Sequence, residues 1–493
     1  MALNDGSAAG VRANRVAIGG GSLGEFGTPS TIERHLKVVR AADVVQSAAK
    51  LSIFLEGVEG DPFGDVQRDL VDELFSPDVA RRLQRELDAG GVGGGFDIVF
   101  APGQLMALQK LAVGIGQPGP PTSFDEGALF DHFLIAAAQV NDVRDSLVDV
   151  ASEDMKDVDL AIYAFRAGEL NRVRHPPSIG GRAYQYWLGS SLPWPTNVEN
   201  PDSFCETTFG MSLRRFVAVA AAPAIDRMAV NMGQPGDIPF NPHTYFSRTK
   251  VGAGQAVAVL QALTYRPANL RSPANDPSVY WSHIDLGERP MMPCGVGILV
   301  PSSLRHALER ATTGVFWMLH TANAGDVGQL TTHFGRMFET YCLNVVQGLR
   351  SQSVSVSGEQ AYGPTRSRKL SSDILVSALS SQGSMRIFIE CRAGRPSRAL
   401  FTTGDVSVFQ AYLRDITAKL GQLHRCIQDH MQRAFTIPDD LAGPNDTYVP
   451  MLVVDEPFQW TLALNLDPPT GPLGRCCRWF VDDRGVGVGV VDG

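Results

Sequence analysis

The sequence predicts an α/β core in the C-terminal part of the chain, with a mixed sheet flanked by helices, preceded by a largely α-helical N-terminal region. Three observations lead to this prediction. Helical patterns occur earlier in the chain, in residues 31–90, in the stretch that ends at about residue 170, and in residues 209–222, 251–264 and 302–320. Two short strand-like runs, Ser372–Val376 and Ile387–Arg392, follow one another closely. Further helical patterns stand directly before and after these two runs.

Length and composition limit how the chain can be organised. A chain of 493 residues has room for roughly two to four domains. Its apolar fraction of 44% is normal for a globular protein, which argues against wholesale disorder. We expect a flexible N-terminus at 1–30, a mostly helical domain at 31–170, a helical or mixed domain at 171–325, an α/β domain at 326–470 and a tail at 471–493.

Targeting and redox signals point to the cytoplasm. The chain has seven cysteines, an odd number with no Cys-x-x-Cys spacing, which is typical of a reducing compartment rather than of a disulfide framework. The N-terminus lacks the basic and apolar pattern of a signal peptide. No apolar run approaches the 18 residues needed to span a bilayer, so no membrane contact is expected.

The elements of the C-terminal core follow one another from about residue 326. The first helix has an apolar face made by Phe334, Phe338, Tyr341, Cys342, Val345 and Leu349. Ser351–Arg368 is rich in Ser and Gly and is interpreted as a polar turn region. A long second helix has a seam made by Phe409, Leu413, Ile416, Leu420, Leu423 and Ile427. The late segment Tyr448–Val454 is strand-like.

The two strand-like runs carry the chemistry. Asp373 begins the first run, and Glu390 and Arg392 lie on one face of the second because side chains alternate along a strand. Carboxylates on adjacent strands suit Mg²⁺ or Mn²⁺, which bind few protein groups and keep their waters for phosphate oxygens. A cation beside them can stabilise a phosphate under attack. The pattern therefore favours metal-dependent hydrolysis of phosphodiester bonds.

These motifs resemble the PD-(D/E)XK nuclease superfamily over residues 326–460. Gly335–Tyr341 resembles the first core helix with its acidic residue Glu339, and Ser372-Asp373 resembles the Pro-Asp position. Glu390-Cys391-Arg392 resembles the E-x-K strand, and Gly421-Gln422-Leu423 lies where many members carry a glutamine. The resemblance implies that Asp373 and Glu390 bind the metal.

The same resemblance implies catalytic roles for Arg392, Glu339 and Gln422, with DNA a better substrate than RNA. The chain departs from the family at Arg392, which replaces a lysine. Arginine keeps the charge but is never deprotonated in practice, and it holds a water less readily than a compact ammonium group. Lys369, four residues before Asp373, is a candidate for the missing amine.

Local charge supports contact with nucleic acid. The whole chain has a net charge of −9, yet residues 350–433 contain 12 Lys and Arg against 6 Asp and Glu. A basic island in an acidic protein is typical of a surface that meets phosphates. The residues expected to bind nucleic acid are Arg366, Arg368, Lys369, Arg395 and Arg398. A protein partner is expected to bind the N-terminal helical region.

Two other interpretations stay open. The nuclease fold could be catalytically degenerate and act as a nucleic-acid-binding or assembly module, which the replacement at Arg392 favours. The carboxylates could also be incidental in a structural or interaction protein. Near the N-terminus, Gly19–Gly24 satisfies both G-x-G-x-x-G and G-x-S-x-G. We reject both motifs because no helix opens at these glycines and no sheet precedes Ser22.

Overall fold

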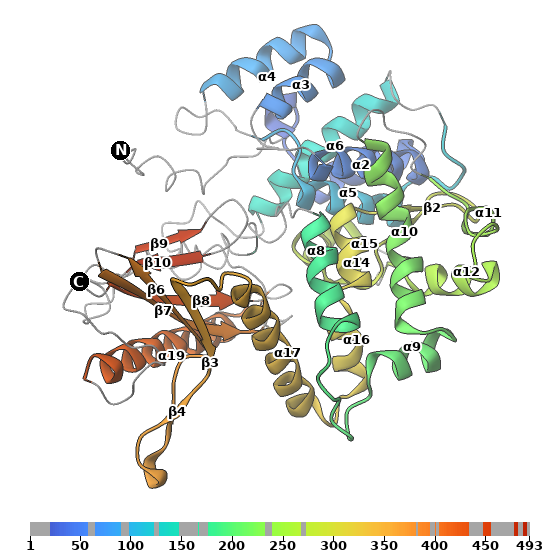
Figure 1. Ribbon diagram of the computed structural model, residues 1–493. Helices are drawn as coiled ribbons and strands as arrows, with labels where there is room; N and C mark the ends of the chain where they lie inside the picture. Colours follow the sequence, from blue (N-terminus) through green and yellow to red (C-terminus); the bar gives the residue numbers. More distant parts are fainter. Residues whose placement is uncertain are drawn as a thin grey trace. The chain divides into compact units, whose positions relative to one another are not determined.

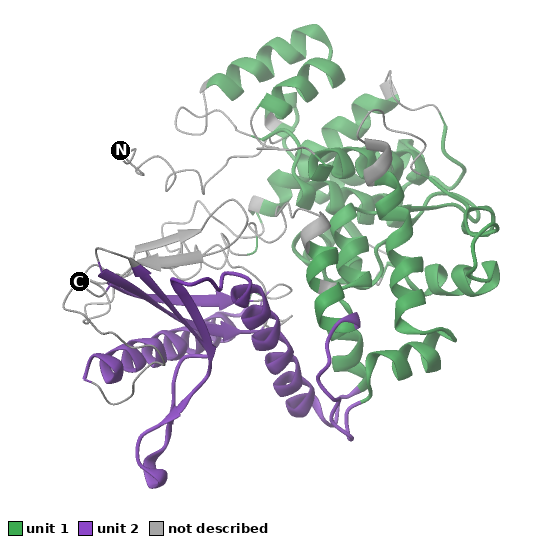
Figure 2. Cartoon of the chain, in the orientation of Figure 1, with its two compact units in different colours: residues 1–187, 199–322, 401–404 green, residues 188–198, 323–400, 405–493 purple. Residues whose placement is uncertain are grey.

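The computed structural model divides the chain into two compact units (Figure 2). Unit 1 comprises residues 1–187, 199–322 and 401–404, and unit 2 comprises residues 188–198, 323–400 and 405–493. The structure describes residues 20–57, 65–89, 98–122, 128–146, 166, 176–231, 239–267, 273–380, 383–394, 400, 404–432, 447–454, 478–481 and 487–490. The two N-terminal regions expected as separate domains therefore fall almost wholly within unit 1.

Unit 1 is built from helices (Figure 1). Its first helices are η2 Gly20–Leu23, α1 Pro29–Val38, α2 Ala41–Gly57, α3 Asp65–Leu74, α4 Pro77–Ala89, α5 Pro102–Ile115 and α6 Ala128–Ser146. The next are α8 Pro176–Ala183, η4 Tyr184–Leu188, α9 Pro201–Phe209, α10 Leu213–Asn231, α11 Pro242–Tyr245 and α12 Ala253–Ala262. The last are η5 Pro273–Asn275, α13 Pro277–Trp281, α14 Ile284–Glu288, α15 Leu304–Ala311 and α16 Val315–Ala322.

Sequence signals explain where many of these helices begin and which of them are buried. Proline is the first residue of α1, α4, α5, α9 and α13, where its fixed φ suits a helix and its missing N–H costs nothing. Every residue of α5 from Pro102 to Ala112 is buried, and α5 packs along α2. The strands β1 (Met291–Pro293) and β2 (Leu299–Pro301) form a short antiparallel pair.

Unit 2 contains the α/β core. Its helices are α17 Val327–Gln347, η6 Thr365–Ser367 and α19 Val406–Met431. Its strands are β3 Val354–Gly358, β4 Ala361–Tyr362, β5 Lys369–Leu370, β6 Ile374–Ser380, β7 Gly383–Arg392, β8 Thr447–Val454, β9 Arg478–Val481 and β10 Gly487–Val490. β9 and β10 pair with each other within the tail that begins at residue 471.

The core sheet of unit 2 is mixed, as the sequence predicts. Its strand order is β3-β6-β7-β8, with β3, β6 and β7 antiparallel and β8 parallel to β7. β4 and β5 lie between β3 and β6 in the chain, and the helical crossover α19 is what allows β8 to run parallel to β7. The sheet lies beside α17 and α19 (Figure 1).

Alternation along β7 divides its side chains between the two helices. Cys391 points toward α17, where it forms a side-chain hydrogen bond with Cys342. Glu390 and Phe388 point the other way, toward α19, and Phe388 lies 5.7 Å from the ring of His430. The predicted two-residue period of this strand is therefore confirmed, and α19 covers the face that carries Glu390.

One prediction for this region is wrong. The segment Ser351–Arg368, interpreted as polar turns, contains β3, which forms an edge of the sheet. Val354 and Val356 alternate with serines, and Val356 is buried against the core. This is the period of a half-buried strand, and the high serine content concealed it. Among the helices that the structure describes, none is long and apolar enough to cross a membrane.

Candidate functional site

Asp373 and Glu390 lie opposite each other on neighbouring strands. In the antiparallel register of β6 and β7, Ile374 pairs with Ile389. The residue before Ile374 and the residue after Ile389 therefore face each other across the strands. Asp373 directly precedes β6 and Glu390 belongs to β7, and burial first and then the charge of Asp373 raise the pKa of Glu390. The structure thus brings together the two residues that the sequence suggests as metal ligands.

Glu390 is held by two residues of α19. Its side chain is fully buried, and its two oxygens accept hydrogen bonds from Lys419 Nζ at 2.8 Å and from Gln422 Nε2 at 2.8 Å. Lys419 and Gln422 are three residues apart, so they lie on the same face of the helix. The predicted neighbour Gln422 is thus in place, and Lys419 is a cation that the sequence analysis did not select.

Asp373 is fixed by the backbone of β7. Its Oδ2 accepts a hydrogen bond from the backbone N–H of Cys391 at 2.7 Å. No hydrogen bond from the described residues reaches its other oxygen, Oδ1. Burial raises the pKa of Asp373, against the lowering effects of this hydrogen bond and of Lys419. One carboxylate oxygen is thus positioned by the backbone of β7.

Two further carboxylates contribute negative charge to this site. Glu339 of α17 has a pKa raised to about 7 by burial and by the charges of Asp373 and Glu359. Glu359, directly after β3, also has a raised pKa because of partial burial and the charge of Asp373. Glu339 was expected from the sequence, whereas Glu359 was not because the strand before it was missed.

The charges in this group do not balance. We call Glu339, Glu359, Asp373, Glu390, Lys419 and Gln422 the carboxylate cluster. Burial first, and then Asp373, raise the pKa of Glu390 to about 7, although Lys419 lowers it. Burial alone would lower the pKa of Lys419, but its hydrogen bond with Glu390 and the other carboxylates raise it. Lys419 therefore stays an ammonium ion among several carboxylates.

Arg392 does not take part in this cluster. It lies on the same face of β7 as Glu390, as predicted, but its guanidinium forms an ion pair with Asp415 of α19. It also lies over the ring of Tyr412, with its Cζ atom 5.8 Å from the ring centroid. Arg392, the cation of β7, therefore contacts α19. The cation beside Glu390 is Lys419, which lies one helical turn after Asp415.

Lys369 is not the missing amine either. Its Nζ pairs with Asp429 Oδ2 at 2.7 Å, and the hydroxyl of Tyr362 donates to the same oxygen at 2.7 Å. Of the other residues expected to bind nucleic acid, Arg366 and Arg368 are exposed. Arg395 and Arg398 lie outside the described residues. Of the predicted basic surface, the described part is therefore the segment around β4 and β5.

A simple spacing rule would have found Lys419. The family resemblance selected Gln422, and Lys419 precedes it by three residues on the same helical face. Asp415 and Tyr412 extend this face backwards by one and two turns. A search of the helix face around Gln422 for a cation would have returned Lys419 without any structural information.

The chemistry of the donors fits a divalent cation. Mg²⁺ commonly takes one or two protein carboxylates and completes its shell with water and phosphate oxygens. Asp373 and Glu390 could supply these two carboxylates. Among the described residues, no three His, Cys, Asp or Glu side chains converge closely enough to hold a metal ion by themselves. A cation here would therefore depend on waters or substrate for most of its ligands.

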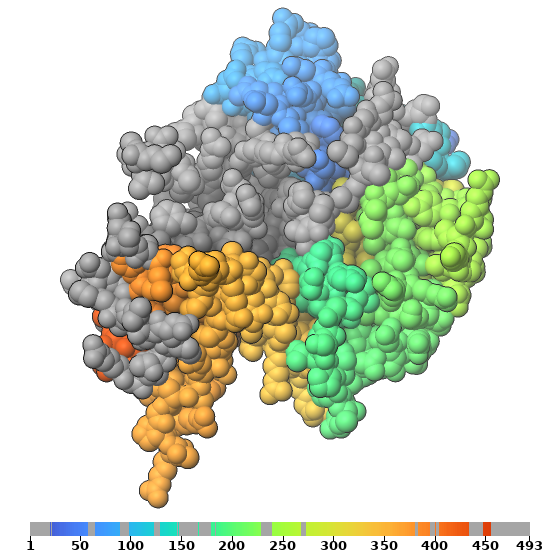
Figure 3. Space-filling model, in the orientation of Figure 1, coloured from blue at the N-terminus to red at the C-terminus, as the bar shows by residue number. Residues whose placement is uncertain are grey.

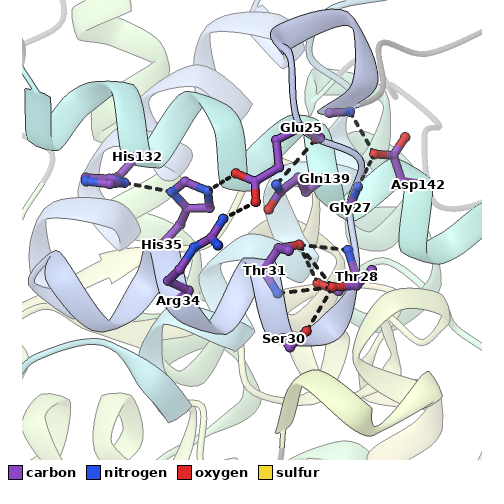
Figure 4. A network of polar contacts seen from close by, with 11 residues as sticks. Glu25, Gly27, Thr28, Ser30, Thr31, Arg34, His35, His132, Gln139 and Asp142 are labelled. Carbon is purple, nitrogen blue, oxygen red and sulfur yellow. Dashed lines mark hydrogen bonds and ion pairs between the residues drawn. The ribbon is translucent and has the colours of Figure 1, made fainter.

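Backbone N–H groups of the glycine-rich segment near the N-terminus bind the carboxylate of Asp142, a residue of the same chain (Figure 4). Asp142 of α6 accepts hydrogen bonds from the backbone N–H groups of Gly20 at 2.9 Å and Gly27 at 2.6 Å. A Cβ on either glycine would collide with Gln139. These glycines therefore serve close packing and a side-chain carboxylate, which agrees with the rejection of both motifs.

The same network contains two histidines in contact. His35 Nδ1 lies 2.7 Å from His132 Nδ1, and its Nε2 lies 2.9 Å from Glu25 (Figure 4). Burial and the neighbouring His35 lower the pKa of His132. The contact links α1 and α6 within unit 1.

No family model, curated protein or solved structure matches this chain.

Proposed function

We propose that unit 2 hydrolyses phosphodiester bonds in nucleic acid with the help of Mg²⁺ or Mn²⁺. The observation that carries the proposal is the position of Asp373, directly before β6, next to Glu390 of β7, with Lys419 and Gln422 hydrogen-bonded to Glu390. The resemblance to PD-(D/E)XK nucleases supports it, because its elements are present in the expected order around these residues.

The proposal assigns a role to every residue of the carboxylate cluster except Glu359. Asp373 and Glu390 would hold the cation, which would polarise the phosphate and lower the pKa of an attacking water. Gln422 orients Glu390 through its hydrogen bond at 2.8 Å. Lys419, still protonated, stabilises the negative charge that grows on the phosphate. Glu339, with a pKa of about 7, can accept a proton from water near neutral pH.

Cleavage assays test this proposal directly. The protein is incubated with single- and double-stranded DNA and RNA in Mg²⁺, Mn²⁺ or EDTA. We expect cleavage of one or more substrates with metal and none in EDTA. Asp373→Asn should lower the rate by about 10³-fold or more, because it removes a charged metal ligand and one fixed point of the site.

A matched variant controls for general damage. Asp326→Asn makes the same chemical change at the start of α17, where the carboxylate contacts only Gln329 among the described residues. It should cleave like the wild type. If the wild type cleaves none of the four substrates with either metal, the proposal is wrong. Equal rates in the wild type and Asp373→Asn would also contradict it.

A second candidate is a catalytically inactive module that binds nucleic acid. The ion pair between Arg392 and Asp415 favours it, because the guanidinium of Arg392 is engaged by α19 and not by Asp373 or Glu390. This module would bind nucleic acid in EDTA and show no cleavage with any metal, so the same assays combined with a binding measurement separate the two candidates.

A further inference from the structure

The segment from Ala361 to Leu370 forms a basic ribbon that projects from unit 2. β4 and β5 pair in the register Ala361 with Leu370 and Tyr362 with Lys369, and η6 closes the tip. Every residue from Gly363 to Leu370 is exposed, and the ribbon appears as an orange projection at the lower edge of the molecule (Figure 3). Gly363 turns the chain with a φ of +85°, which favours glycine.

The base of this ribbon is firmly attached. Gln360 and Ser371 exchange two hydrogen bonds of 2.8 Å where the ribbon leaves the sheet. Asp429 of α19 then accepts hydrogen bonds from Tyr362 and Lys369, one from each strand of the ribbon. These bonds lower the pKa of Asp429, so it stays ionised. The ribbon is thus anchored to the helix that carries Lys419 and Gln422.

The charge on the ribbon is wholly positive. No Asp or Glu occurs between Glu359 and Asp373, whereas Arg366, Arg368 and Lys369 lie in that interval. Lys369 is engaged by Asp429, which leaves the two arginines at the tip, without an ion-pair partner among the described residues. The guanidinium group is well suited to phosphate because its N–H groups can bond to two oxygens at once.

The shape and composition of the ribbon indicate the kind of partner. Its tip sequence, from Gly363 to Lys369, contains no large apolar side chain, so it is unsuited to entering a lipid bilayer. Its one aromatic residue, Tyr362, lies at the base with its hydroxyl bonded to Asp429, so no free ring is presented to stack on unpaired bases. A two-stranded ribbon fits the B-DNA major groove, which is about 12 Å wide, but not the narrow major groove of an RNA duplex.

We propose that this ribbon binds double-stranded DNA through contacts of Arg366 and Arg368 with backbone phosphates. The inference deepens the proposed function and rests on it, since it assigns duplex DNA as the substrate of the carboxylate cluster. Lys369 acts as a positioning residue, because its bond to Asp429 fixes the ribbon. The two arginines supply affinity, and the register of the ribbon on the duplex sets which phosphate reaches the cluster.

The test measures binding separately from cleavage. A fluorescent DNA duplex, its single strand and an RNA duplex of the same sequence are titrated in EDTA at several salt concentrations. The variant Arg366→Ala/Arg368→Ala should bind duplex DNA at least 10-fold more weakly. Its salt dependence, as the slope of log affinity against log salt, should be smaller by about 1.8, because two phosphate contacts are lost.

A control variant and an anchor variant complete the experiment. Arg82→Ala/Arg85→Ala removes the same charge from the exposed face of α4 and should bind like the wild type. Asp429→Asn keeps both arginines but loosens the base of the ribbon, and should weaken duplex binding by a few fold. Melting curves check that every variant folds.

Each outcome supports or overturns the proposal that the ribbon binds duplex DNA. Duplex binding that is unchanged in Arg366→Ala/Arg368→Ala, or absent in the wild type, overturns it. An equal loss for single-stranded DNA or for the RNA duplex overturns the choice of duplex DNA. Ribbon-dependent binding without cleavage in Mg²⁺ or Mn²⁺ supports the ribbon and contradicts the proposed hydrolysis. Cleavage at an unchanged rate in the ribbon variant supports hydrolysis and overturns the ribbon.

Discussion

Buried charges have different surroundings in the two units. In unit 1, Glu56 of α2 accepts hydrogen bonds from the backbone N–H groups of Leu304 and Arg305 at 2.6 and 3.1 Å, at the start of α15. Lys110 of α5 donates to the carbonyl of Ser282 at 2.6 Å and to Asp285 at 3.2 Å. Each charge meets groups of opposite polarity, which is how a buried charge stabilises a fold.

In unit 2 the buried charges face charges of the same sign. Burial first, and then the charge of Asp373, raise the pKa values of Glu390 and Glu339, while Lys419 lowers both. Burial also raises the pKa of Glu56 to about 7, but every neighbour that acts on it lowers the pKa. The difference teaches that burial alone does not indicate a site. Burial together with uncompensated like charge does.

The largest effect that would test this contrast is expected at Lys419. Lys419→Met should lower cleavage by about 10²–10³-fold, because it removes the one cation bonded to Glu390. Lys419→Arg should restore part of the rate. The control is Arg414→Met, an exposed cation on the same helix. A similar loss in both methionine variants would mean that the helix, and not the cluster, is damaged.

Stability should respond next, with a clear loss in unit 1. Lys110→Met leaves the carbonyl of Ser282 without its buried donor, and should lower the free energy of unfolding by about 2 kcal/mol. The control is Lys37→Met at an exposed position on α1, which should change it by less than about 0.5 kcal/mol. Urea unfolding followed by circular dichroism measures both. Equal losses would show that the bonds of Lys110 add no stability.

Neutralising a carboxylate in unit 2 should raise the free energy of unfolding, whereas removing Lys110 should lower it. The folded pKa of Glu339 is raised to about 7 from 4.5, so its ionisation costs stability as pH rises between these values. Glu339→Gln should therefore stabilise the protein by about 1 kcal/mol at pH 8, since water partly screens this half-buried group, and by almost nothing at pH 5. Unfolding at the two pH values is the measurement. A loss of stability at pH 8 would contradict the like-charge explanation.

Divalent metal should give a smaller, pH-dependent effect. Protons and Mg²⁺ compete for Glu390, whose pKa is about 7. Mg²⁺ should raise the melting temperature of the wild type by a few degrees at pH 8 and hardly at all at pH 6. Asp373→Asn should show no rise at either pH. A rise at pH 8 in this variant would place the metal elsewhere.

Local patterns were enough to predict the face of β7 and the order of the elements. The period of two placed Glu390 with Arg392, whereas Gln422 came from the family resemblance. The partners of these residues depend on packing between distant segments. Whether α19 offers Glu390 a lysine or an aspartate depends on how the helix lies across β7. In the same way, the position of α19 beside β4 and β5 decided that Lys369 meets Asp429.

The smallest effect is expected at Arg392, and it tests where the site ends. Arg392→Lys should change cleavage by less than about threefold, because the arginine contacts Asp415 and Tyr412 and not the carboxylate cluster. Lysine can keep the ion pair but loses the planar contact with the ring, so a small loss of stability should accompany it. Arg392→Met, which loses both contacts, should cost more stability and still cleave. A tenfold change in cleavage with lysine, in either direction, would return Arg392 to the reacting phosphate and reduce Lys419 to a structural partner of Glu390.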